Sequence, residues 1–70
     1  MKVGDAVAWK WANGLAEGTI REIHIERTEI ISKGKKIARN GSADNPALVI
    51  DHKSGNPVLK LQSEVQNTGN

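Results

Sequence analysis

The side chains best suited to contact a ligand are two tryptophans near the N-terminus, Trp9 and Trp11. They are two residues apart, so on a β-strand both indoles point to the same side and can flank one groove. A methyl-lysine cage needs several aromatic rings, and the chain contains no Phe or Tyr. Two interpretations remain open. Either one indole fills the core while the other lies at its rim, or both form a stacking surface for a ligand.

Cations gather further along the chain. Between residues 27 and 39, five basic residues accompany a single acid, Glu29, although the formal net charge of the whole chain is only +2. In a solvated hairpin, such cations keep an edge strand from pairing with other chains. As a patch, they would contact phosphates while the tryptophans stack on bases. The residues of this alternative, nucleic-acid binding, are Arg27, Lys33, Lys35, Lys36 and Arg39.

The densest polar segment runs from residue 39 to residue 46. Its Asn-Gly and Asp-Asn-Pro sequences are typical of turns, which explains the composition structurally. Loops on a rigid scaffold often carry function, so the same side chains are candidates for a hydrogen-bonding surface beside the tryptophans. We predict a non-catalytic module that recruits a protein or peptide partner, with the binding residues Trp9, Trp11, Arg39, Asn40, Ser42 and Asp44.

The residue pattern gives little support to catalysis. The absence of cysteine excludes a thiolate nucleophile, disulfides and cysteine-based zinc sites. His24 and His52 lie on separate strand candidates, without the spacing of a metal-binding pair. The sequence Lys33-Gly34-Lys35-Lys36 lacks the glycine spacing of a phosphate loop. We therefore predict no catalytic residue, no metal and no cofactor. An oligomeric dinucleotide-binding or reductase-like barrel is the least favoured alternative.

The length restricts the chain to one small domain. Seventy residues bury only about 60% of the surface that the unfolded chain exposes, which leaves no room for a deep substrate cavity. No apolar run approaches the ~20 residues of a membrane span, and the first residues lack the apolar core of a signal peptide. We expect a soluble cytoplasmic protein without a membrane partner, either a monomer or a weak homo-oligomer.

Turn residues divide the chain into short strands. Residues 3–11 alternate in polarity, and Asn13-Gly14 is a typical hairpin turn pair. The β-branched stretch from residue 16 to residue 32 reads as one strand, and it changes phase beside Gly18, which predicts a bulge or sharp bend. Gly34 marks the next reversal, before a short polar strand at residues 36–39.

The last third of the sequence completes the predicted sheet. Residues 46–51 predict a strand that is covered on both faces, and residues 58–61 return antiparallel with Leu59 and Leu61 inward. Ser63 is a candidate cap for a single helical turn through Val65. Five short strands bury a core only by curling, so we predict an all-β, five-stranded SH3-like barrel over residues 1–65. Residues 66–70 form a predicted disordered tail.

Two stretches carry a family resemblance. Lys2-Val3-Gly4-Asp5-Ala6-Val7-Ala8-Trp9, followed by Ala16-Glu17-Gly18-Thr19-Ile20, resembles the opening of Tudor-like barrels. Residues 37–47, with Val58-Leu59-Lys60 and Ser63-Glu64, are similar to the hypervirulence-associated Tudor-like domain family, and the likeness extends over residues 2–65. The resemblance implies a Tudor-type barrel and no particular activity. Leu48 stands where relatives often carry an aromatic residue, which argues against an aromatic pocket in this member.

Overall fold

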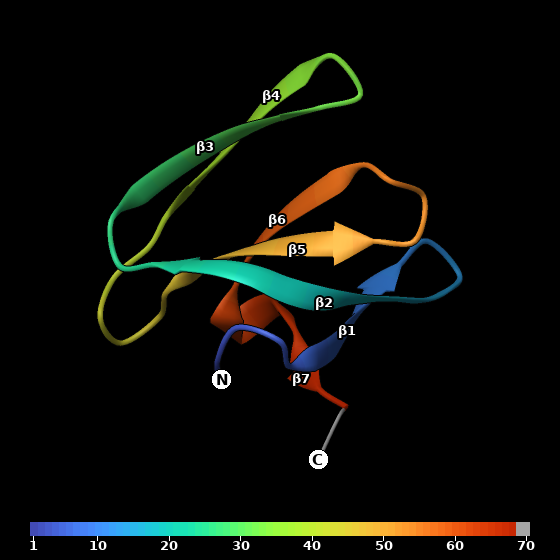
Figure 1. The fold of residues 1–70 in the computed structure, drawn as a ribbon, viewed down its shortest axis with the longest axis horizontal. Coiled ribbons are helices and arrows are strands. Elements are labelled where there is room, and N and C mark those ends of the chain that lie inside the picture. The colour runs from blue at the N-terminus through green and yellow to red at the C-terminus, as the bar shows by residue number, and fades with distance from the viewer. Residues whose placement is uncertain (69–70) are drawn as a thin grey trace.

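The fold is built from seven strands and one turn of 3₁₀ helix (Figure 1). The computed structural model describes residues 1–68, so the last two residues of the predicted tail lie outside the described part of the chain. The predicted all-β class is confirmed. In chain order the elements are β1 (Ala6–Trp11), β2 (Gly14–His24), β3 (Arg27–Ser32), β4 (Lys35–Asn40), β5 (Ala47–His52), β6 (Pro57–Leu61), η1 (Gln62–Glu64) and β7 (Gln66–Asn67).

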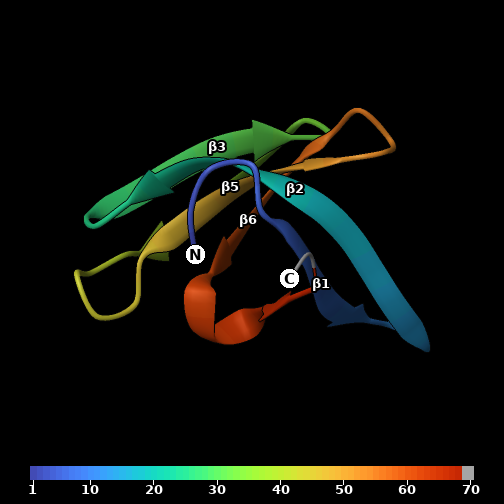
Figure 2. The same ribbon diagram turned by 60° about the horizontal axis from the view of Figure 1, so that its bottom comes forward.

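Strand pairing produces one curled sheet and one separate hairpin. The five-stranded antiparallel sheet has the order β6-β5-β2-β1-β7, while β3 pairs only with β4. The two edge strands of the sheet, β6 and β7, are consecutive in the chain, and η1 joins them (Figure 2). The sheet therefore curls until its two edges meet at η1. The hairpin packs against β6 without joining the ladder.

The central strand β5 is buried on both faces, as predicted. Leu48 and Ile50 belong to the main core, with β1, β2 and Val65 around them. Ala47 and Val49 point to the opposite face, where Leu59 packs with the half-buried isoleucines of the β3–β4 hairpin, Ile30 and Ile37. Leu59 is buried and Leu61 is half-buried against the same cluster, so the inward direction predicted for both is confirmed. Burying both faces of one strand gives this short chain two small cores.

The stretch from residue 16 to residue 32 was predicted as one strand, and this was wrong. Strand β2 ends at His24, and β3 begins at Arg27, because the chain reverses there to lay the hairpin over β5 and β6. The predicted irregularity is confirmed in β2, where the pairing with β5 shifts register between Ile20 and Glu22. Gly18 is required for close approach, since a Cβ there would lie 2.5 Å from a methyl carbon of Ile50.

Two details of the turns and the tail also differ from expectation. The β1–β2 turn is centred on Ala12 and Asn13, one residue before the expected Asn-Gly pair, because Trp11 pairs with Gly14. Ala12 takes a positive φ of 51° there. Gln66 and Asn67 were expected to fray but pair with β1 as β7. Backbone pairing holds this segment, and the Asn67 side chain adds a 3.0 Å hydrogen bond to Asp5, so no apolar anchor is needed.

Candidate binding site

The two tryptophans occupy different environments. Trp9 is 4% exposed, lies in the main core and places its ring centroid 6.1 Å from that of His52. Trp11 is 68% exposed, at the end of β1 where it pairs with Gly14. This is an arrangement with one indole in the core and one outside it. Trp9 therefore has no ring face to offer to a partner, whereas Trp11 does.

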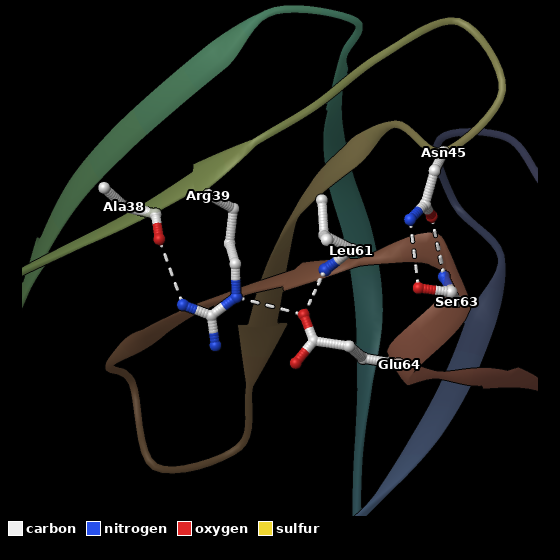
Figure 3. A network of polar contacts seen from close by, with 6 residues as sticks. All are labelled: Ala38, Arg39, Asn45, Leu61, Ser63 and Glu64. Carbon is white, nitrogen blue, oxygen red and sulfur yellow. Dashed lines mark hydrogen bonds and ion pairs between the residues drawn. The ribbon is translucent and has the colours of Figure 1, made fainter.

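Arg39 holds η1 in place (Figure 3). Its Nε donates to Oε1 of Glu64 at 3.0 Å, and its Nη1 donates to the carbonyl of Ala38 at 3.0 Å. The same Glu64 oxygen accepts the backbone N–H of Leu61 at 2.7 Å. Desolvation by partial burial raises the pKa of Glu64, but the Leu61 hydrogen bond and the Arg39 guanidinium outweigh it. The pKa of this carboxyl consequently lies below its ordinary value.

The loop after β4 is tied to the same turn. Asn45 donates from Nδ2 to the Ser63 hydroxyl at 3.0 Å and accepts the Ser63 backbone N–H at 2.9 Å (Figure 3). The Ser42 hydroxyl accepts the Asn45 backbone N–H at 3.1 Å, within the loop. Ser63 was expected to cap η1, but the Glu64 carboxylate accepts the N–H at its start. Asn45 and Glu64 are thus structural residues that the site prediction missed. An amide that reaches 18 residues along the chain leaves no local signal.

The predicted composite of tryptophans and polar loop is not assembled around Trp11. Strand β2 separates Trp11 from the loop, since Trp11 pairs with Gly14 at one end and Ala47, just after the loop, pairs with His24 at the other. Those ten steps correspond to about 30 Å of strand. The remaining loop residues fit a structural role or plain exposure. Asn40 accepts a hydrogen bond from Arg27 at 3.1 Å, and Asp44 is exposed.

The five basic residues of the nucleic-acid alternative do not form one patch. On the outer face of the hairpin, Arg27 and Lys36 pair with Glu29 at 3.1 Å and 3.5 Å. The hydrogen bond from Arg27 and the charge of Lys36 lower the pKa of that carboxyl. Arg39 and Lys35 share the parity of Ile37, which packs inward, so they lie on the other face. Lys33 lies in the turn with a φ of 54°.

A groove that the sequence did not indicate lies beside β1. It encloses about 300 Å³ between the β1–β2 hairpin and the segment from β6 to β7. Strand β7 pairs with β1 only at Val7 and Ala8, so in the described structure the β1 edge from Trp9 to Trp11 has no strand beside it. The residues that line the groove are Ala8, Trp9, Lys10, Leu15, Lys60, Ser63, Glu64, Val65 and Gln66.

A second depression lies at the β2–β3 corner and measures about 400 Å³. Four of the titratable side chains around it are paired with one another, His24 with Glu22 at 2.8 Å and Arg27 with Glu29. Within residues 1–68, no three His, Asp or Glu side chains lie close enough together to hold a metal ion. No helix in this part of the chain is long and apolar enough to cross a membrane.

Comparison with known families agrees with this architecture. Residues 4–65 match the family described as hypervirulence associated proteins TUDOR domain. This chain belongs to that family. The membership confirms the resemblance seen in the opening strand and in the loop after β4, and it accounts for the small antiparallel fold. Neither a curated protein nor a solved structure matches the chain significantly.

Proposed function

We propose that this Tudor-like domain is a non-catalytic binding module that recruits a protein or peptide partner in the groove beside β1. The observation that carries the proposal is the β1 edge, which β7 covers only at Val7 and Ala8. An uncovered edge presents backbone N–H and C=O groups that an extended peptide can pair with. The groove adjoins this edge, so backbone pairing and side-chain contacts would occur together.

The groove walls favour a particular peptide chemistry. Leu15 is 68% exposed and provides the apolar contact. Lys10 and Lys60 place two cations at the same groove against one carboxylate, Glu64, which Arg39 already pairs, so acidic side chains on the peptide would be attracted. Because side chains alternate along an extended segment, we expect apolar and acidic residues two positions apart.

The test is a selection from a phage-displayed library of random heptapeptides, using the full chain as bait. The enriched peptides should carry apolar and acidic residues two positions apart, and Leu15→Asp should weaken their binding at least tenfold. Ile25→Asp is the matched control, because Ile25 is 62% exposed in the β2–β3 loop, away from the groove. N-methylation of alternate peptide amides should abolish binding if backbone pairing contributes. No enrichment, or equal losses in both variants, would contradict the proposal.

A further inference from the structure

One carboxylate, that of Glu64, links the groove beside β1 to the β3–β4 hairpin. Glu64 lines the groove together with Lys10 and Lys60. Its Oε1 also accepts a hydrogen bond from Nε of Arg39 at 3.0 Å, and Arg39 belongs to β4 in the hairpin (Figure 3). Arg39 does not itself line the groove. The hairpin therefore acts on the groove through the charge of Glu64.

The position of this carboxylate decides which charges the groove presents to a partner. Oε1 is held by two donors, Nε of Arg39 and the backbone N–H of Leu61 at 2.7 Å. The guanidinium is held in turn by the carbonyl of Ala38, 3.0 Å from Nη1. While these contacts are intact, the guanidinium neutralises the negative charge of Glu64, and the two lysines of the groove remain available to a partner.

Lys60 is an alternative partner for the same carboxylate. Desolvation raises the pKa of Glu64, the contacts with Leu61 and Arg39 lower it, and the charge of Lys60 lowers it further, so Lys60 lies within electrostatic reach. Among residues 1–68, however, no carboxylate is within ion-pair distance of Lys60. A Glu64 side chain without Arg39 can turn to Lys60 and neutralise it. An acidic peptide would then meet one free lysine fewer.

The β3–β4 hairpin is the element that can withdraw Arg39. Within residues 1–68 no strand ladder joins it to the five-stranded sheet. The two isoleucines on its inner face, Ile30 and Ile37, are only half-buried. Elements held by few buried contacts open at a lower free energy than the whole domain. The strands beside the groove, β1 and β6, belong to the sheet, so opening of the hairpin removes Arg39 and leaves both strands in place.

We propose, on the basis of the peptide groove proposed above, that the hairpin regulates this groove through Arg39, which keeps the Glu64 carboxylate from pairing with Lys60. With the hairpin closed, both lysines of the groove attract acidic side chains of the peptide. With the hairpin open, Glu64 occupies Lys60, and acidic peptides bind more weakly. Arg39 is thus a positioning residue that acts through Glu64. Because such coupling is reciprocal, a bound acidic peptide also holds the hairpin closed.

The experiment is a fluorescence-anisotropy titration of two labelled heptapeptides with the full chain, one alternating glutamate with leucine and the other glutamine with leucine. Arg39→Gln should weaken binding of the glutamate peptide about fivefold and leave the weaker binding of the glutamine peptide unchanged. Glu64→Gln keeps an oxygen for the Leu61 N–H but has no charge. In that background, Arg39→Gln should change binding of the glutamate peptide by less than about twofold.

Arg21→Gln is the matched control. It also removes one cation and one ion pair, with Asp51 at 3.1 Å, but Arg21 lines the depression at the β2–β3 corner and not the groove. Binding of both peptides should be unchanged in this variant.

Native-state hydrogen exchange gives a second, independent value of the coupling. At saturation, the glutamate peptide should slow the opening-dependent exchange of β3 and β4 amides by the same factor, about fivefold, by which Arg39→Gln weakens its binding. In Arg39→Gln itself, the bound peptide should leave the exchange of the hairpin amides unchanged.

Three results would overturn the proposal. Equal losses from Arg39→Gln with Glu64 and with Glu64→Gln would show that Arg39 acts by its own charge. Equal losses for the glutamate and glutamine peptides would show that η1 has merely loosened. Hairpin exchange that does not respond to the bound peptide would show that the two are uncoupled. In all three cases the groove still binds peptide, whereas an unmodified chain that binds neither peptide would contradict both proposals.

Discussion

At the scale of single residues, Trp9 and Trp11 present the same side chain on the same side of one strand. Around Trp9, the main core supplies Val7, Ile20, Leu48 and Ile50 as neighbours. Trp11 lies two residues further along β1, outside this core, and its side chain is 68% exposed. A substitution at Trp9 therefore leaves a cavity, whereas a substitution at Trp11 removes surface that water already reaches.

We expect Trp9→Ala to lower the free energy of unfolding by about 3–5 kcal/mol, as large core truncations do. Trp11→Ala should change it by less than about 0.5 kcal/mol, because the side chain is at the surface. Urea denaturation followed by far-UV circular dichroism measures both values. Equal small losses in the two variants would show that neither indole belongs to the core.

The alternation of β1 could predict that the two indoles share a side, but not how deeply each is buried. Depth depends on β5 and Val65, which come from distant parts of the chain. The irregularity in β2 was predictable because the change of phase in its apolar alternation can be seen in neighbouring residues of the sequence. The site was predicted poorly because it depends on contacts between distant parts of the chain: Arg39 and Asn45 meet their partners in η1 only after folding.

At the scale of elements, η1 depends on side chains from elsewhere. Glu64 Oε1 accepts both the Leu61 N–H and Nε of Arg39, which fixes the turn between β6 and β7. Because the pKa of Glu64 is lowered in the folded state, the ionised carboxylate stabilises the fold. That stabilisation is present above the ordinary pKa of 4.5 and is lost as the pH falls through the lowered value.

Glu64→Gln should therefore cost about 1 kcal/mol at pH 7, a modest amount because the side chain is one-third exposed. The difference from the unmodified chain should shrink below pH 4.5. Urea denaturation at pH 7, 5 and 3 tests this, with Glu17→Gln as an exposed control on β2. A difference that stays constant down to pH 3 would rule out a contribution from the Glu64 charge.

Most strands were predictable from turn residues and alternation, whereas two boundaries were not. The reversal at Ile25 and Glu26 contains no Gly, Pro, Asn or Asp, so nothing local marks it. Strand β7 is polar, and what makes it a strand is the free edge of β1 beside it. Both boundaries are set by tertiary pairing and packing.

At the scale of the whole molecule, the β3–β4 hairpin is attached differently from the other strands. Within residues 1–68 no strand ladder links it to the five-stranded sheet. Its attachment includes Ile30 and Ile37, packed on the cluster of Ala47, Val49 and Leu59, and the Arg39–Glu64 ion pair. The hairpin can therefore open while the sheet stays intact, at a lower free energy than global unfolding.

Native-state hydrogen exchange should show β3 and β4 amides exchanging through a lower-energy opening than those of β2 and β5. Ile37→Ala removes packing of a half-buried side chain and should lower the free energy of hairpin opening by about 1–2 kcal/mol. It should therefore speed amide exchange mainly in the hairpin. Ile31→Ala is the control, since Ile31 is 69% exposed on the outer face. If the amides of all strands exchanged with the same free energy of opening, the hairpin and the sheet would unfold together.

The pairing of β1 with β7 also determines when the domain can finish folding during its synthesis. Val7 pairs with Asn67, sixty positions later. A ribosome must release nearly the whole domain before β1 gains its second neighbour. Until then Trp9 lacks the cover of Val65, and the complete edge of β1 is open to chaperones. The domain is therefore completed only after Asn67 has left the exit tunnel, and a nascent chain stalled earlier exposes the strand that later borders the groove.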